Sequence, residues 1–363
     1  MTPQPGTAAP GTFAPLAAPE KLAMPPVVLG TMTFADGADE ATSRELLHLA
    51  LDAGVTWLDT ANQYADGRGE PLVGRLLAQL PAARREQLVV ATKVGQPDPE
   101  LGSESQLRPE IVRRSVERSL ERLGTEQLDL LYLHKPDRST PIVETMGELA
   151  ALHREGKVAR IGLSNFTAWQ IAQAIESAAA AGAPRPVIAQ QMYSAIVRRL
   201  DEEYAELAAE AAIATVVYNP LAGGLLTGRY RFGDAAAEGR FGSFGNAAMY
   251  RDRYWDERMF AAVERIAAIA EEAGLPVAEA ALRWTLSRPV VDGVLVGGSK
   301  AAQAAAEPRG ARGGAAARGR RAGDRRRGRR AARADARVRP LRGAARLPAA
   351  PAIPPSPVGS RGS

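Results

Sequence analysis

The sequence contains no cysteine and only three histidines. The lack of cysteine excludes disulfides, thiolate nucleophiles, Cys-ligated zinc and iron–sulfur clusters, and three histidines do not suit a His-rich metal site, so we expect no metal. No stretch approaches the ~18 consecutive apolar residues of a membrane-spanning helix. The first twenty residues have neither a basic start nor an apolar run, so they do not resemble a secretory signal. We therefore expect a cytoplasmic protein without membrane partners.

Charge is unevenly distributed along the 363 residues. Residues 304–363 hold 16 arginines, no lysine and 3 acidic residues, whereas the rest of the chain holds 30 basic and 38 acidic residues. The body is therefore mildly acidic and shows no nucleic-acid footprint. The basic tail could bind nucleic acid, but it has no aromatic residues that would stack on bases, and we expect no nucleic-acid partner.

Short apolar runs alternate with amphipathic stretches eight times between residues 26 and 303. Such runs are typical of strands buried on both faces, and apolar residues at i, i+4, i+8 and i+11 from Val112 indicate a helix over 109–123. This α/β order predicts a (β/α)8 TIM barrel. A doubly wound sheet is the alternative, but the glycine-rich G-x-G-x-x-G loop that usually follows its first strand is absent. The predicted strands are Val27–Thr31, Val55–Asp59, Leu88–Lys93, Leu128–His134, Val158–Ser164, Val187–Gln190, Ile213–Tyr218 and Val294–Gly297.

Three segments do not fit the repeat. Residues 1–25 are mostly Ala, Pro, Gly and Thr and are predicted to be a disordered lead. Residues 219–257 form one long connection after the seventh strand, which suggests a functional loop. Residues 304–363 are rich in Arg, Ala, Gly and Pro, and their abrupt change of composition indicates a disordered tail or a shifted reading frame.

Polar residues stand at the ends of the predicted strands. In a barrel all eight strand ends meet on one face, where active sites lie. The sequence therefore gathers a carboxylate, an ammonium and an imidazole at the mouth, from three neighbouring strands. These residues are Asp59, Lys93 and His134, followed by Ser164, Asn165, Gln190, Tyr218 and Asn219 on the later strands.

Tyr64 follows Asp59 by five residues, and the loop between them can bring its phenol over the mouth. An ammonium ~4 Å away favours phenolate by on the order of 4 kcal/mol, or roughly three pKa units, so we expect Lys93 to bring the pKa of Tyr64 near the working pH. Such a proton donor suits carbonyl reduction. The alternative reading is structural: Asp59 and Lys93 could form an ion pair at the rim, and each remaining residue alone could serve packing.

The chain resembles the aldo-keto reductases over about residues 27–303. The resemblance rests on "LGTMTF", "DTANQY", "ATK", "GKVARIGLSNF", "AALRW" and "GGSKAAQ", and the motifs "YLHKPD", "YNPLAGGLLTGRY" and "YRDRYW" are most similar to the branch that reduces aflatoxin dialdehyde and succinic semialdehyde. It implies a catalytic tetrad of Asp59, Tyr64, Lys93 and His134, with Tyr64 as general acid, and a small carbonyl compound as substrate. A homodimer is possible.

The resemblance also implies NADPH as cofactor, bound without a Rossmann domain. Ser164, Asn165 and Gln190 would hold the carboxamide, and Tyr218 would stack on the nicotinamide. Asn219–Arg229, including Leu221, Gly223 and Leu225, would run along the pyrophosphate, where Arg229 can pair a phosphate. Gly298, Ser299, Lys300 and Gln303 fall where the family grips the adenosine 2′-phosphate. Arg240 and Arg253, in the long connection, could bind an acidic substrate group or be solvated surface residues.

Three other functions stay open at this point. A potassium-channel beta-like subunit could bind NADPH on the same fold without catalysing a reaction. A Schiff-base aldolase would need a neutral Lys93, which Asp59 disfavours. The tail could bind nucleic acid. After Gln303 the sequence departs from the family pattern, which places the last helix and the C-terminal substrate loop in question.

A charge reversal at Lys300 tests the expected preference for NADPH. Lys300→Glu should weaken NADPH binding far more than NADH binding, because Lys300 is the basic residue nearest to the expected 2′-phosphate site. Fluorescence titration with both cofactors measures this. Equal losses for the two would show that Lys300 does not read the phosphate.

Overall fold

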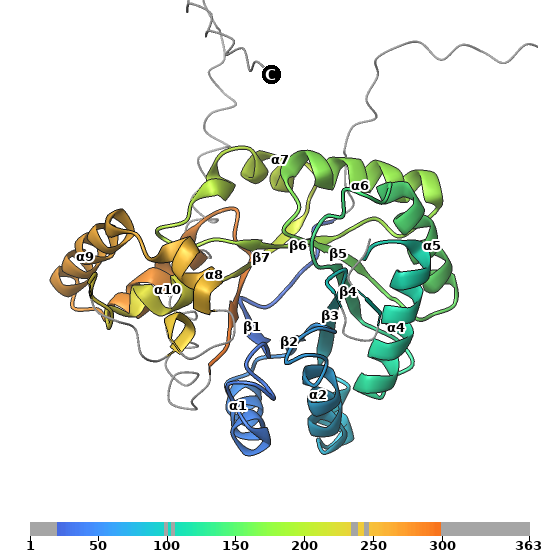
Figure 1. Ribbon diagram of the computed structural model, residues 1–363, viewed down its shortest axis with the longest axis horizontal. Coiled ribbons are helices and arrows are strands. Elements are labelled where there is room, and N and C mark those ends of the chain that lie inside the picture. The colour runs from blue at the N-terminus through green and yellow to red at the C-terminus, as the bar shows by residue number, and fades with distance from the viewer. Residues whose placement is uncertain (1–19, 98–100, 103–105, 234–238, 243–246, 299–363) are drawn as a thin grey trace, which may run out of the picture. The chain divides into compact units, whose positions relative to one another are not determined.

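A computed structural model describes residues 20–97, 101–102, 106–233, 239–242 and 247–298 of the chain. Eight parallel strands close into a barrel in the order β1 to β8, and helices surround it (Figure 1). This confirms the predicted (β/α)8 architecture. The strands are β1 Val27–Gly30, β2 Trp57–Asp59, β3 Val89–Val94, β4 Leu130–Leu133, β5 Ile161–Ser164, β6 Ile188–Met192, β7 Ala214–Tyr218 and β8 Gly293–Val296.

The predicted strand starts are early by one to three residues at several places, for a local reason. The backbone N–H of Val55 donates to the carbonyl of Ala50 at 3.0 Å, so Val55 completes the turn that ends the preceding helix. Similarly, Leu128 pairs with Val158 only as an isolated bridge outside the strands. Apolar residues just before a strand, such as Val55 and Leu128, are as deeply buried as the residues of the strand itself. The sequence pattern alone therefore does not show where the strand begins.

The helices of the outer ring present apolar faces to the strands. In α4 the side chains of Val112 and Val116 are fully buried, Pro109 stands in the first turn, and Gly124 ends the helix with φ of 65°. Among the described residues none of the helices is both long and apolar enough to cross a membrane. The helices are α1 Glu40–Asp52, α2 Gly69–Ala78, α3 Ala82–Arg85, α4 Pro109–Leu123, α5 Ile142–Arg154, α6 Ala168–Ala181, α7 Tyr204–Glu210, α8 Ala247–Tyr254, α9 Glu257–Glu272 and α10 Val277–Ser287.

The long connection after β7 is more ordered than a loop. It contains the 3-10 turns η2 (Ala222–Thr227) and η3 (Gly239–Phe241) and the helix α8, which gather beside α9 and α10 at one side of the barrel (Figure 1). Its aromatic side chains Phe241, Tyr250 and Tyr254 form a small core of their own with Phe260 of α9. The segment is therefore a packed lobe, because it has enough buried apolar surface to fix its own shape.

The lower part of the barrel is filled by apolar side chains. Inward-facing residues such as Trp57, Leu130 and Ile188 form one cluster, against which Leu22 and Met24 pack from the N-terminal segment. This differs from the prediction of a disordered lead up to residue 25, because these two residues supply apolar surface that covers the barrel. Residues 1–19 and 304–363 lie outside the described residues.

Tyr132 belongs to this apolar cluster inside the barrel. Gly162 on the neighbouring strand leaves space for its ring, since a Cβ there would lie 2.5 Å from Tyr132 Cδ1. Side chains alternate between the two faces of a strand. Two positions after Trp57 comes Asp59, and two after Ala91 comes Lys93, so the next inward-facing layer carries charge at the mouth of the barrel.

Candidate active site

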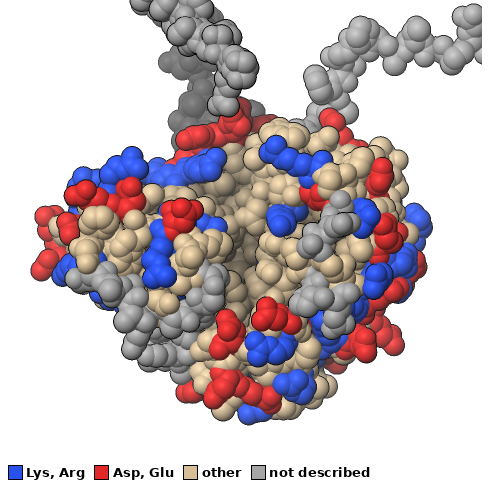
Figure 2. All heavy atoms as spheres, viewed as in Figure 1, with Lys and Arg blue, Asp and Glu red and all other residues tan. Residues whose placement is uncertain are grey.

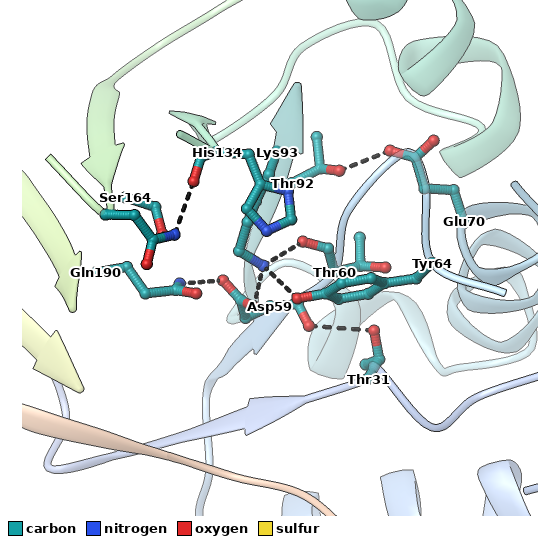
Figure 3. Close-up of polar contacts among 11 residues, drawn as sticks. Thr31, Asp59, Thr60, Tyr64, Glu70, Thr92, Lys93, His134, Ser164 and Gln190 are labelled. Atoms are coloured by element: carbon teal, nitrogen blue, oxygen red, sulfur yellow. Dashed lines mark hydrogen bonds and ion pairs between the residues drawn. The ribbon is translucent and has the colours of Figure 1, made fainter. Parts of the chain in front are cut away.

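Lys93 joins the predicted catalytic residues into one cluster. Its ammonium contacts the carboxylate of Asp59, donates to the carbonyl of Thr60 at 2.7 Å, and lies 3.1 Å from the Tyr64 hydroxyl (Figure 3). Asp59 is 1% exposed and Lys93 is 0% exposed. Three acceptors match the three hydrogens of an ammonium, so the charged form of Lys93 is fully satisfied although it is buried.

Lys93 keeps its positive charge beside Asp59. Burial is the largest single effect on the pKa of Lys93 and lowers it, but the charges and hydrogen bonds of Asp59 and Tyr64 together outweigh burial, so the pKa of the ammonium lies above its usual value. Burial raises the pKa of Asp59, and Lys93 and Gln190 oppose that rise. The second carboxylate oxygen of Asp59 accepts a hydrogen bond from Gln190 Nε2 at 2.7 Å. A charged lysine cannot attack a carbonyl group, which counts against a Schiff-base aldolase.

Tyr64 differs from the expectation in its acidity. Burial raises the pKa of this phenol, and the lowering effect of Lys93 does not overcome the effect of burial. The expected value near the working pH was wrong in direction because it counted the attraction of the ammonium and left out the cost of burying a phenolate. Tyr64 therefore holds its proton at neutral pH, with a cation beside its oxygen.

His134 is a neutral imidazole beside Tyr64. The side chain is 9% exposed, and burial, followed by the charges of Lys93 and Lys135, holds its pKa well below the usual range. The two rings meet edge to face with centroids 6.1 Å apart. Its Nδ1 atom is buried and has no hydrogen-bond partner among the described residues. A neutral imidazole next to a phenol gives the mouth a second hydrogen-bonding group without adding charge.

The residues expected at the nicotinamide lie around the ends of β5 and β7. Asn165 has a left-handed backbone, with φ of 63°. Its Nδ2 donates to the His134 carbonyl at 2.9 Å and to Ser164 Oγ at 3.0 Å, while its Oδ1 accepts from the Tyr218 hydroxyl at 2.6 Å. Gln190 is different, because it is 3% exposed and its amide nitrogen is committed to Asp59. Gln190 therefore contacts Asp59, and its expected contact with the nicotinamide carboxamide stays a prediction.

The segment Asn219–Arg229 makes an unusually tight turn after β7. Asn219, Ala222, Gly223 and Gly224 all have positive φ values, between 50° and 104°. A Cβ at Gly223 would lie 2.8 Å from the Tyr250 ring, so the turn is pressed against α8. Leu225 is buried in the core of the lobe, and Leu221 packs at its edge. Any contact of Leu225 with a cofactor would therefore come from its backbone.

Three arginines face this side of the site and suit an anionic ligand. Arg229 is exposed and lies over the Tyr230 ring, 4.7 Å from its centroid. Arg240 donates to Asn219 Oδ1 at 3.3 Å and also contacts the Tyr250 hydroxyl. Arg253 lies 5.9 Å from the centroid of Tyr254. The exposed guanidinium of Arg229 has the chemistry to pair a phosphate of a dinucleotide. Gly298 accepts a hydrogen bond from Thr33, and Ser299, Lys300 and Gln303 lie outside the described residues.

A separate hollow of about 490 Å³ lies between η2 and the helices α9 and α10. Thr227, Phe260, Val263 and Leu275 line it, and none of the four predicted catalytic residues does. The four predicted catalytic side chains converge elsewhere, at the mouth of the barrel. Among the described residues, no group of three or more His, Asp or Glu side chains could hold a metal ion.

Two functional neighbours were missed by sequence reasoning. The buried Glu70 and the half-buried Arg122 form a pair behind the loop that carries Tyr64, with Arg122 Nη1 and Glu70 Oε2 3.6 Å apart. Neither stands at the end of a strand, which is why the strand-end pattern did not select them. The available signal was a carboxylate on the apolar face of α2, where Leu72, Val73 and Leu76 are buried.

Comparison with known proteins agrees with this geometry. The family description "Aldo/keto reductase family" matches residues 26–308. The chain is 37% identical to human "Aflatoxin B1 aldehyde reductase member 4" over 269 residues, covering 72% of this chain and 80% of that protein. It is 39% identical to human "Aflatoxin B1 aldehyde reductase member 2" over 266 residues, covering 71% and 72%. A "Probable voltage-gated potassium channel subunit beta" of Arabidopsis thaliana is 30% identical over 273 residues, covering 75% and 82%.

The chain belongs to the aldo/keto reductase family, as its resemblance predicted. Members of this family generally use NAD(P)H and act on small carbonyl compounds.

The neutral state of His134 predicts how stability responds to acid. Its folded pKa is depressed, so below about pH 6.5 the unfolded chain binds a proton that the folded chain does not, and stability falls as pH falls. The loss is about 1.4 kcal/mol per pH unit. Between about pH 7.5 and 5.5 the wild type should therefore lose about 1.4 kcal/mol of unfolding free energy that His134→Gln does not lose. Urea unfolding at both pH values measures it.

His48→Gln is the matched control, because His48 is exposed on α1. Its pH dependence should follow that of the wild type. If His134→Gln also follows the wild type, the imidazole of His134 is not buried in its neutral form.

Proposed function

We propose that this chain reduces an aldehyde or ketone to the alcohol, using NADPH. The observation that carries the proposal is the position of the Tyr64 hydroxyl, 3.1 Å from a buried and charged Lys93 ammonium. A phenol beside a fixed cation can give up its proton to an oxygen that becomes negative, since the cation then stabilises the phenolate. Membership of the aldo/keto reductase family supports the same reaction class.

Each residue of the cluster has one role in this mechanism. Bound NADPH would supply the hydride that the carbonyl carbon receives. Tyr64 donates its proton to the carbonyl oxygen, so that the product is a neutral alcohol and Tyr64 is left as phenolate. Lys93 stabilises that phenolate, and Asp59 keeps Lys93 charged and in place. His134, being neutral, donates a hydrogen bond to the carbonyl oxygen and thereby orients the substrate.

Residues along β5, β7 and the lobe would hold the cofactor. Ser164, Asn165 and Tyr218 already form one hydrogen-bonded group beside the His134 carbonyl, which suits the nicotinamide end. Arg229 and the turn before it suit the diphosphate. We assign the adenosine 2′-phosphate to Ser299 and Lys300, with Gly298 and Gln303 beside them, which favours NADPH over NADH.

Of the two candidate substrate arginines, Arg253 is the better placed. Arg240 is committed to Asn219 and Tyr250, so it holds the turn after β7 against α8. Arg253 is half-buried in α8, and it lies near enough to Tyr218 to oppose the rise that burial gives to the pKa of that phenol. Figure 2 shows this face of the molecule hollowed between the lobe and the rest of the barrel, with mostly uncharged surface in the hollow. A half-buried arginine near Tyr218 would select a substrate with an acidic group.

Substitution of Arg253 tests this selection. Arg253→Met should raise KM about tenfold or more for an aldehyde that carries a carboxylate, because a hydrogen bond to a charged group is lost. KM for a neutral aldehyde of the same length should stay within about twofold, since that substrate never made the contact. Arg258→Met is the control, because Arg258 is exposed and pairs with Asp256 at the start of α9. Equal changes for both substrates would remove Arg253 from the substrate site.

A non-catalytic role is the second candidate function. It rests on the 30% identity to the Arabidopsis protein named as a probable channel subunit. A chain of that kind would bind NADPH but would not turn over carbonyl compounds at a rate that depends on Tyr64. An aldehyde panel with NADPH therefore separates the two functions.

Removal of the Tyr64 hydroxyl is the central test. Tyr64→Phe should lower kcat by roughly 10²–10⁴-fold, the usual contribution of a general acid. NADPH affinity should stay close to that of the wild type, because the cofactor residues lie on β5, β7 and the lobe. Tyr204→Phe serves as control, since its hydroxyl contacts only Thr215 among the described groups, at 2.7 Å on the far side of β7. A Tyr64→Phe enzyme with more than about a tenth of the normal kcat would exclude Tyr64 as the acid.

A further inference from the structure

The loop that carries Tyr64 has a strained backbone. Ala65, Asp66 and Gly67 follow Tyr64 directly and all have left-handed φ values, of 52°, 54° and 84°. Residues other than glycine rarely adopt this conformation, because their Cβ approaches the following carbonyl oxygen. The turn closes through the Tyr64 carbonyl, which accepts from the N–H groups of Gly67 at 3.2 Å and Gly69 at 3.0 Å. Such a turn persists only where the surroundings hold it.

Arg122 of α4 holds this loop on both sides of Tyr64. Its Nη1 donates to the carbonyl of Asn62 at 3.2 Å, two residues before Tyr64. Its Nη2 lies below Gly67, three residues after Tyr64, where an added Cβ would come within 3.1 Å of it. One guanidinium group therefore bonds to the start of the segment that places the phenol and lies close to its end.

Glu70 lies beside the guanidinium and connects it to β3, and burial raises the pKa of its carboxyl above the usual value. Its side chain is 0% exposed, one oxygen accepts from Thr92 Oγ1 at 2.6 Å, and the other faces Arg122 Nη1 at 3.6 Å. Thr92 precedes Lys93 on β3, and the two side chains point to opposite faces of the strand, Thr92 toward Glu70 and Lys93 toward Asp59 (Figure 3). The pair is thus anchored, through Thr92, to the strand that carries Lys93.

We propose that the buried Glu70–Arg122 pair is a positioning device that sets the Tyr64 hydroxyl against the Lys93 ammonium. It connects the Tyr64 loop, through Arg122, to β3, through Thr92, and so fixes the distance between two groups that come from different elements. Its effect on turnover rests on the proposed role of Tyr64 as the acid. Its effect on the position of the phenol does not depend on any activity.

The competing explanation is that the pair only holds helices α2 and α4 together. The packing of these helices distinguishes that explanation from a positioning role. Helices α2 and α4 already approach closely at Gly74, where an added Cβ would lie 2.4 Å from the Arg122 carbonyl oxygen. This contact uses the backbone of α4 and survives changes of the Arg122 side chain. A buried ion pair that is replaced by apolar residues on both sides usually leaves a protein as stable as before, whereas removal of one partner destabilises it.

The decisive variant is therefore the double substitution Glu70→Met with Arg122→Met. Its thermal unfolding should stay near that of the wild type, while kcat should fall by roughly 10²-fold, because displacement of a reacting group by about 1 Å costs that much. NADPH affinity, measured by fluorescence, should change less than twofold. Arg113→Met is the control, since Arg113 also lies on α4 and is half-buried in an ion pair, with Glu148 of α5 at 2.7 Å.

A second readout does not require activity. In protein labelled with ¹³C-tyrosine, the Tyr64 ring resonance is assigned by its loss in Tyr64→Phe. It should shift in the double variant and in Glu70→Gln, which keeps the shape of the side chain, and it should stay unchanged in Arg113→Met. If Tyr64→Phe retains turnover, the proposed acid is wrong, yet the shift still reports whether the pair positions the phenol. An unshifted Tyr64 resonance in both Glu70 variants would overturn the inference, and so would a kcat of the double variant within twofold of Arg113→Met.

Discussion

The buried ammonium of Lys93 is the interaction on which the site depends. A charge removed from water must be compensated where it lies, and here a carboxylate, a backbone carbonyl and a phenol oxygen take its three hydrogens. Asp59 ends β2, and Thr60 and Tyr64 lie in the segment between β2 and α2. The ammonium therefore gathers that segment around β3, and the phenol shares in the compensation of the charge. In this way a requirement of stability and a requirement of chemistry are met by the same contacts.

The barrel and the residues at its mouth could be predicted from the sequence because both depend on local pattern. Short apolar runs that end in a polar residue are enough to place Asp59, Lys93 and His134 at one face, since closure of the barrel does the rest. The family resemblance, now confirmed, added the cofactor residues as expectations. Their roles, and those of the four residues at the mouth, stay predictions.

What could not be predicted depends on contacts between distant segments. The direction of the shift in the pKa of Tyr64 follows from how deeply its ring is buried, which no local pattern records. The position of Gln190 below Asp59 depends on the register between strands on opposite sides of the barrel. The lobe after β7 was taken for a loop because its aromatic residues are spaced irregularly, and they become a core only when Phe241 and Tyr250 meet. Arg122 stands 60 residues from the Asn62 carbonyl it contacts.

The apolar cluster that contains Tyr132 limits the routes by which a proton can reach the mouth of the barrel. Apolar side chains and the segment around Leu22 and Met24 close the barrel beneath Asp59, so the buried charges face a dry floor. In the proposed reaction, Tyr64 would have to recover its proton before it could act again. With the floor closed, that proton would enter by the opening through which substrate would arrive and product would leave. Reprotonation of Tyr64 and the exchange of substrate and product would then use the same opening. A new cycle would begin only after the product has left that opening.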